Sequence, residues 1–348
     1  MRLFRSDQIA PCSEMRYGYI LLLAFILTPV PQLFAQDAEL ENAIAAYQSA
    51  DFDGAIAQFA DLAGDDVADK QVRKEALQYL GRAYVAKRME DQARQTIHEL
   101  LELEPPLVEL DPDVESPPLM NLYYEVRKEV EGDYAVERAD PGLQTLAIID
   151  FNNNSITDDQ VQLEPLGRGL AALMISFLSG STDLKVIERE RLQWLLDEMD
   201  LQKDQSRVDQ ETAVRAGKLL GATSVLLGDF MKMNRRSMAI NVRLVKVETG
   251  EVLMTEQVRG RPDRFYEMAE ELSLKVAQGI NAHLDGTTLG ARDDTKSLDA
   301  MLSYSDGLAL LEQREYRAAY EKFLEALEYD PGYTKAKLKA DSIKPLLT

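Results

Sequence analysis

Cysteine and histidine, on which most metal centres and many nucleophilic enzymes depend, are almost absent from this sequence. Its 348 residues contain one cysteine, Cys12, and two histidines, His98 and His283. Cys12 precedes the apolar run at residues 17–28, so it does not end that run as a lipid-anchor cysteine would, and no later cysteine offers a disulfide or a thiol nucleophile. Each histidine stands alone on a predicted helix, without Asp, Glu or Cys at metal-ligand spacing. The sequence therefore indicates no metal, no cofactor and no catalytic residue.

Basic residues are also scarce. The chain has 39 Lys and Arg against 60 Asp and Glu, which gives a formal net charge of −21. So acidic a protein repels phosphate backbones, and nucleic-acid binding would require a local basic patch. The pair Arg235-Arg236 falls in a predicted turn and is best explained as a solvated hairpin tip. We therefore exclude nucleic acid as a partner, while the hydrophobic content of 45% is that of a globular protein.

Short patterns that often mark catalytic or ligand sites are incomplete here. The Gly-Lys pair at 217–218 suggests a phosphate loop, but Thr212 stands where the first glycine belongs and no Ser or Thr follows the lysine. The Gly-Arg-Gly segment at 167–169 opens a predicted helix, whose N-terminus would suit an anion, but it follows a loop instead of a strand. The carboxylates of Glu188 and Glu190 fall on a predicted helix surface, where we expect them to be solvated. The sequence thus favours a protein that is not an enzyme.

Residues 1–35 have the features of a secretory signal peptide. An apolar run at 17–28 follows a basic residue, and the small residue Ala35 precedes the polar Gln36, so we predict cleavage between these two. An uncleaved membrane anchor is the alternative, although two prolines make the run short for a membrane span. Translation from Met15 would give a more ordinary leader. Cleavage predicts a periplasmic protein that has no membrane span of its own and reaches the outer membrane only through partners.

Helical repeats are predicted at both ends of the chain, at residues 36–107 and 298–348. Within them, residues 74–107 and 300–333 fit the 34-residue tetratricopeptide pattern, in which small residues let two helices approach and large residues fill the space between repeats. The second repeat is followed by a predicted capping helix. The residues that carry the pattern are Gly81, Tyr84 and Ala93 in the first repeat, and Gly307, Ala319, Phe323 and Pro331 in the second.

These repeats predict a surface for protein partners. Stacked helical repeats form a concave groove that accepts peptides or partner helices. By analogy with other repeats of this kind, Gln78, Arg82 and Val85 are predicted to face the groove. An isolated repeat is only marginally stable, so the C-terminal repeat is expected to dock against the rest of the chain or against another subunit.

Between the repeats, residues 108–143 are predicted to be a proline-rich acidic connector with a helix, and residues 144–286 an α/β domain. The connector is expected to be extended, because prolines and acidic residues crowd it. In the central domain, segments alternate in the order β-α-β-α-α-β-β-β-α, including a strand at 224–231 that is interrupted at Gly228. This order predicts a mixed sheet with packed helices, so the chain is α/β in its middle and all-α at both ends.

Several phrases follow one another in the central domain at compatible spacings. They are residues 147–151, the run Val186-Ile-Glu-Arg-Glu-Arg-Leu192, Glu198, residues 216–222, Leu227-Gly228 and residues 244–251. In this order the segment resembles the CsgG-type curli assembly/transport family and its relatives, the FlgO-like and LpoB-like lipoproteins and the N-terminal domain of TolB. No single phrase is diagnostic, and the resemblance rests on their order over more than a hundred residues.

The resemblance implies an envelope protein that binds and assembles protein partners and catalyses nothing. Two features of the family's channel-forming members are missing, a lipidated N-terminal cysteine and two long amphipathic hairpins. The available insertions, at 152–164, 202–209 and 233–237, are too short for pairs of roughly ten-residue membrane strands. Two hypotheses remain. One is an adaptor in envelope assembly, secretion or cell-wall biogenesis, and the other is a ring-forming structural oligomer without membrane hairpins.

Overall fold

The computed structural model describes residues 30–65, 69–103, 109–135, 143–181, 183–199, 208–282, 284 and 294–347, with side chains from Gln36 onward. Cys12, Met15 and His283 lie outside the described residues, as does most of the predicted leader. The bond between Ala35 and Gln36 falls inside the first helix, α1 (Val30–Gln48), and cleavage there stays a prediction. In the part of the chain that is described, no helix combines the length and the apolar character needed to cross a membrane.

Among the described residues, six strands form one mixed sheet in the order β3-β1-β4-β5-β6, with β2 beside β4. The strands are β1 (Gln144–Ile148), β2 (Asn152–Asn153), β3 (Leu184–Val186), β4 (Ser224–Asn234), β5 (Ser237–Lys246) and β6 (Val252–Gly260). Strand β1 is parallel to β3 and β4, whereas β4, β5 and β6 are successively antiparallel. The mixed sheet that the sequence predicts for the central domain is confirmed.

Strand β4 is continuous, and the predicted interruption at Gly228 is wrong. Gly228 keeps its place in the ladder opposite Val242 of β5. A Cβ atom on Gly228 would lie 2.3 Å from the ring of Phe151, which follows β1. The glycine therefore makes room for an aromatic ring against the sheet and does not end the strand.

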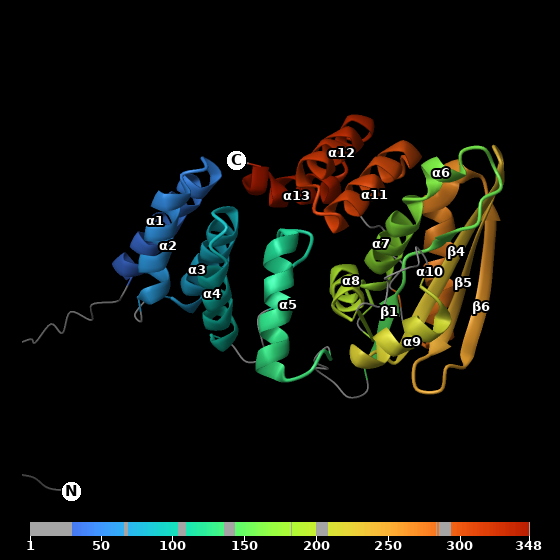
Figure 1. Ribbon diagram of the computed structural model, residues 1–348, viewed down its shortest axis with the longest axis horizontal. Coiled ribbons are helices and arrows are strands. Elements are labelled where there is room, and N and C mark those ends of the chain that lie inside the picture. Colours follow the sequence, from blue (N-terminus) through green and yellow to red (C-terminus); the bar gives the residue numbers. More distant parts are fainter. Residues whose placement is uncertain are drawn as a thin grey trace, which may run out of the picture.

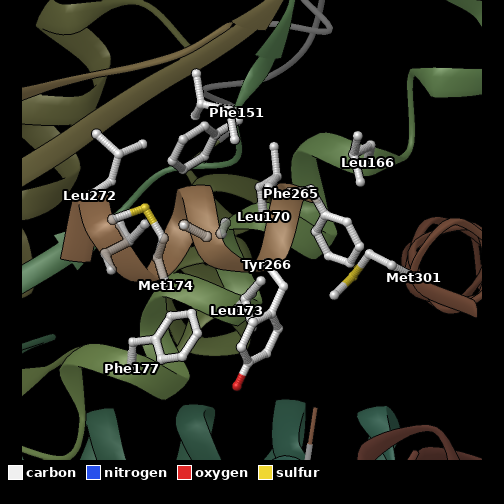
Figure 2. Close-up of a cluster of buried hydrophobic side chains, with 14 of the residues drawn as sticks. Phe151, Leu166, Leu170, Leu173, Met174, Phe177, Phe265, Tyr266, Leu272 and Met301 are labelled. Carbon is white, nitrogen blue, oxygen red and sulfur yellow. The ribbon is translucent and has the colours of Figure 1, made fainter. Parts of the chain in front are cut away.

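Helices pack on both faces of the sheet at β1 and β4, and α10 lies along the strands β4 to β6 (Figure 1). The helices of the central domain are α6 (Gln160–Leu163), α7 (Leu166–Leu178), α8 (Arg189–Glu198), α9 (Gln210–Leu219) and α10 (Phe265–Gly279), with a short 3-10 turn, η1 (Pro262–Arg264), before α10. Leu146 and Ile148 of β1 enter the core under α7 and α10, whereas Ala147 and Ile149 enter the core shared with α8 and α9. Figure 2 shows Phe151 and Phe265 in the first of these cores, among side chains of α7 and α10.

The flanking segments are helical, as predicted. The N-terminal flank contains α1, α2 (Phe52–Gly64), α3 (Lys70–Ala86), α4 (Glu90–Glu102) and α5 (Pro117–Glu131), and the C-terminal flank contains α11 (Leu298–Glu312), α12 (Tyr316–Tyr329), α13 (Thr334–Ile343) and the 3-10 turn η2 (Lys344–Leu347). Consecutive helices pack on each other in both flanks. Their assignment as tetratricopeptide repeats stays a prediction.

The residues proposed to pack the repeats occupy different positions. Ala93, Ala319 and Phe323 are fully buried, and a Cβ on Gly307 would lie 2.5 Å from the Phe323 ring, so these two residues bring α11 and α12 into close contact. Tyr84 is partly buried and Pro331 is exposed just after α12 ends. Gly81 is buried, and its nearest neighbour is Leu119 of α5, outside the predicted repeat.

The C-terminal helices lie along the rest of the molecule and join its two ends (Figure 1). Helix α11 packs on α7 of the central domain, and η2 reaches α3 of the N-terminal flank. Leu346 accordingly packs against both hydrophobic cores. The C-terminal flank therefore docks on this chain, one of the outcomes that the isolated repeat leads us to expect.

The described part of the connector is folded and not extended as predicted. The amides of Val114 and Glu115 both donate to the carbonyl of Asp111, at 3.0 and 2.9 Å, which closes a tight turn. Glu115 is only 3% exposed. Its carboxylate is bound by Arg82 of α3, and this pairing holds the acidic segment against the helices.

Candidate functional site

Four consecutive charged residues, Glu188 to Arg191, begin helix α8 immediately after the edge strand β3. A helix turns by about 100° per residue, so four successive side chains point in four directions. Helix α8 lies between α5 and α7 near the middle of the molecule (Figure 1). Arg189 and Glu190 therefore meet different segments of the chain, whereas Glu188 and Arg191, three residues apart, both face the segment around α5. We call these four residues and their partners the charged junction.

Arg189 joins the central sheet to the C-terminal flank. Its guanidinium donates to both carboxylate oxygens of Asp150, at the end of β1, each at 2.8 Å. It also forms an ion pair with Glu312, the last residue of α11. Arg168 of α7 binds the same Glu312 carboxylate at 2.9 to 3.1 Å. Arg189 is 7% exposed, and although burial opposes its charge, Asp150 and Glu312 raise its pKa well above the ordinary value.

Glu190 ties the same helix to α13 and to the connector. Its carboxylate accepts a hydrogen bond from the ammonium of Lys339 at 2.7 Å. Lys339 is 3% exposed and also donates to the carbonyl of Pro112 at 2.8 Å, with Asp113 at 3.4 Å. Burial alone would raise the pKa of Glu190, but the charges of Lys339 and Arg189 lower it to about 2.

Glu188 and Arg191 bind the segment around α5. The hydroxyl of Tyr124 donates to Glu188 at 3.1 Å, and Arg191 donates to the carbonyls of Tyr134 and Ala135 at 3.1 and 3.0 Å. Burial and the neighbouring Glu190 raise the pKa of Glu188 to about 7. The expectation that Glu188 and Glu190 form a solvated surface pair is wrong, because the flanking helices pack over them and supply their partners.

The charged junction holds segments of the chain together through paired charges. Its cations and carboxylates are occupied by one another, by a tyrosine hydroxyl or by backbone carbonyls. Across the residues that the structure describes, no group of three or more His, Cys, Asp and Glu side chains is placed to hold a metal ion. The absence of enzyme activity stays a prediction.

The pKa of Glu188 makes stability depend on pH. The ordinary pKa of a glutamate is 4.5 and the value in the folded protein is about 7, so the folded state binds the Glu188 proton more tightly than the unfolded state does. This tighter proton binding stabilises the folded protein at low pH, and the stabilisation is lost as pH rises through 7. Glu190, with a pKa of about 2, does not titrate in this window. At 1.36 kcal/mol per pKa unit, we expect Glu188→Gln to stabilise the protein by roughly 2–3 kcal/mol more at pH 8 than at pH 5. Urea unfolding at both pH values measures the difference.

Glu211→Gln is the control for this measurement, because Glu211 is an exposed carboxylate in the first turn of α9. It should change the free energy of unfolding by the same small amount at both pH values. If Glu188→Gln behaves in the same way, Glu188 does not carry a raised pKa in the folded protein.

The Gly-Arg-Gly segment at the start of α7 serves packing. A Cβ on Gly167 would lie 2.0 Å from the backbone oxygen of Phe151, and one on Gly169 would lie 2.2 Å from Ser305 of α11. Arg168, between them, binds Glu312. The two glycines therefore let α7 approach the end of β1 and α11, and the anion site considered for this helix start gains no support.

The Gly-Lys pair in α9 is likewise structural. A Cβ on Gly217 would lie 2.8 Å from Val225 and 3.0 Å from Val247, so the glycine lets α9 lie close to the sheet. Lys218 is exposed. The helix ends before Gly221, whose φ of 71° suits a glycine, as the sequence predicts for a helix stop.

Of the three residues predicted to face a partner groove, one lines a cleft. Arg82 donates to Glu115 at 2.6 and 2.7 Å and lies 4.5 Å from the centre of the Tyr79 ring. It borders a cleft of about 400 Å³ between the N-terminal helices and the end of the C-terminal flank. Val85 is 8% exposed and belongs to the core, and Gln78 is partly buried outside the cleft lining. The helix periodicity indicates which residues share a face, but not which face is covered.

The sequence patterns do not predict the charged junction, although its four charged residues stand together in one phrase. The available signal was the position of Glu188 to Arg191, directly after the carboxyl end of a strand parallel to β1. In open α/β sheets, a crevice opens at the carboxyl ends of the strands where the strand order reverses. Strand β1 lies between β3 and β4, so the chain continues from β1 to a neighbour on one side and has its other neighbour on the opposite side. Charged side chains at that point meet partners from several elements.

Residues 137–236 match the family described as curli production assembly/transport component CsgG. No curated protein matches the chain significantly. Among solved structures, the chain is similar to the C-terminal domain of LpoB from Salmonella enterica, at 13% identity and a TM-score of 0.26, over 38% of this chain and 90% of that one. It is also similar to TolB from Acinetobacter baumannii, at 14% identity and a TM-score of 0.27, over 42% of this chain and 29% of that one.

A third similar structure is lipoprotein GNA1162 from Neisseria meningitidis, at 16% identity and a TM-score of 0.27, over 39% of this chain and 94% of that one. Structural similarities of this size support no functional assignment. The family match runs from before β1 to the end of β4, including the phrase that forms the charged junction. The chain therefore contains a CsgG-like domain at residues 137–236.

Proposed function

We propose that this chain is a cell-envelope accessory or assembly protein that acts by binding other proteins and not by catalysis. The observation that carries the proposal is the match of residues 137–236 to an assembly/transport family. The predicted leader at residues 1–35 would deliver the chain to the periplasm, where it would reach the outer membrane through partners.

The cleft beside Arg82 is the proposed partner surface. Tyr47, Phe52 and Tyr79 line one wall, and Leu338 and Leu346 line the other. Charged and polar residues of the C-terminal flank, Asp341, Ser342 and Lys344, also border it. An apolar centre that contains aromatic rings and is bordered by polar groups is typical of protein interfaces. In this proposal the two flanks act together as helical repeats would, with the groove formed where they meet.

Site-specific photo-crosslinking in cells tests this surface. A photoreactive residue at Phe52 or at Leu338 should give the same crosslinked partner from both positions, since both side chains border one cleft. The control position is Arg236, an exposed residue at the β4–β5 hairpin tip. Adducts that form equally from Arg236, or that differ between the two cleft positions, would contradict the proposal.

A ring-forming structural oligomer is the alternative function. Strand β6 lies at the edge of the sheet, and Val252 and Leu253 at its start are 44% and 46% exposed. Exposed apolar residues on an edge strand favour association with another strand. Light scattering on the purified chain distinguishes the two, because a monomer at micromolar concentration excludes a stable ring.

A further inference from the structure

A cavity of about 230 Å³ lies between helix α5 and the edge strand β3, beside the charged junction. Tyr123 and Arg127 of α5 line one side, and Lys185 of β3 lines the other. Arg191 and Glu188, from the start of α8, and Glu109 of the connector also line it. Three cationic side chains therefore face one small space.

Carboxylates compensate two of these three cations. Lys185 binds Glu109 at 3.0 Å, and the Nε of Arg127 donates to both oxygens of Glu131 at 3.1 Å. Arg191 donates only to the carbonyls of Tyr134 and Ala135. Among the described residues, no carboxylate lies within ion-pair distance of Arg191. Among the cations that line the cavity, the Arg191 guanidinium is thus the one that no carboxylate of the described residues binds directly, although the Glu188 carboxylate lies in the same wall.

Arg127 adds an unused donor to the same space. Arg127 is 2% exposed, and its Nη2 atom is buried without a hydrogen bond. Nη2 lies 3.1 Å from Glu131 Oε1, which makes an ion pair but does not have the geometry of a hydrogen bond. Burial and the positive charge of Arg127 lower the pKa of Arg191. Buried guanidinium donors without acceptors are costly, and two like charges in one cavity repel. A bound anion would remove both costs.

We propose that this cavity binds a small oxyanion, held between the guanidinium groups of Arg127 and Arg191 with Lys185 beside it. The planar fork of a guanidinium matches the oxygens of a phosphate or a carboxylate. The volume of about 230 Å³ is below the roughly 300–1,000 Å³ of ordinary ligand pockets, which suits an anion of few atoms. The site goes beyond the proposed function, because it requires no protein partner.

Thermal unfolding of the whole chain tests the proposal, with sodium phosphate or sodium acetate added at an ionic strength kept constant with sodium chloride. The measurements are made at pH 6, where Glu188, with a pKa of about 7, is mostly neutral. We expect at least one of the two anions to raise Tm by about 2–5 °C over chloride, with the ratio between them showing whether phosphate or carboxylate is preferred. No rise with either anion overturns the proposal.

Variants place the effect in the cavity. Arg191→Gln should abolish the rise in Tm, and Lys185→Gln, which removes a side chain that is 26% exposed, should weaken anion affinity several-fold by calorimetry while the protein stays folded. The control is Arg243→Gln, an exposed arginine on β5. If Arg191→Gln does not fold, the calorimetric result for Lys185→Gln decides. The site would be overturned if the Lys185→Gln variant bound the anion as strongly as the Arg243→Gln variant and the unaltered protein do.

Discussion

Replacing Arg189 with methionine is expected to lower the free energy of unfolding by about 3–5 kcal/mol, the usual cost of removing one partner from a buried ion pair. The substitution leaves the carboxylate of Asp150 without its bidentate partner and leaves Glu312 with Arg168 alone. Because Arg189 is 7% exposed, water cannot readily replace the lost contacts. The free energy of unfolding is measured by urea denaturation, monitored by circular dichroism.

The control for this prediction is Arg261→Gln. Arg261 pairs with Asp263 at 2.7 Å, but both side chains are more than half exposed, so the loss should stay within about 0.5 kcal/mol. A second variant tests the cause. Arg189→Met combined with Asp150→Asn should recover part of the loss, because it removes the carboxylate charge that has lost its bidentate partner, while Glu312 keeps Arg168. Equal losses for Arg189→Met and Arg261→Gln would show that the charged junction does not hold the chain together.

Gly167→Ala is the second substitution with a large expected effect, a loss of about 3 kcal/mol or more in the free energy of unfolding. The added Cβ would lie 2.0 Å from the backbone oxygen of Phe151. That oxygen belongs to the segment between β1 and β2, and the Phe151 amide donates to the Gly167 carbonyl at 3.2 Å. A backbone atom cannot move aside as a flexible side chain can, so α7 must shift on the sheet. Thermal unfolding and urea denaturation measure the loss.

Two other helical glycines serve as matched controls for Gly167→Ala. Gly169→Ala meets the side chains of Ser305 and Met301, which can rotate away, so a smaller loss is expected. Gly64→Ala, at the end of α2, meets nothing within 4 Å and should be neutral or stabilising by up to about 1 kcal/mol, since alanine favours a helix. The prediction fails if Gly167→Ala is as stable as Gly64→Ala.

The mixed sheet was predictable because its signals are local. Met238, Ile240, Val242 and Leu244 alternate with polar or small residues, and all four are buried in one core. Gly221 and the turn at Thr249-Gly250 also fall where their backbone preferences place them. The interruption predicted at Gly228 was wrong because a glycine in a strand marks a close neighbour as readily as a break, and the neighbour here, Phe151, lies 77 residues earlier in the sequence.

The charged junction was not predictable in the same way. Glu190 and Lys339 are 149 residues apart, and Arg189 and Glu312 are 123 residues apart. A run of alternating acidic and basic residues at the start of a helix usually indicates a solvated surface, because most such helix starts face water. Only the packing of α5, α11 and α13 around α8 brings the partners within reach and makes the charges internal.

The sequence by itself determined the order of the main strands and helices, but not β2 and α6, which lie in the stretch 152–164 predicted as an insertion. It also determined the strand and helix periods and the resemblance of the central segment to an assembly family, since each depends on residues close together in the chain. The tertiary structure decided which charges pair, which helix faces are covered and where cavities remain. The physical reason is that hydrophobic periodicity is read from neighbouring residues, whereas a Coulombic partner is chosen by distance in space and by exclusion of water. The same phrase, Glu188 to Arg191, thus appears as a solvated helix start in the sequence and as the internal charged junction in the fold.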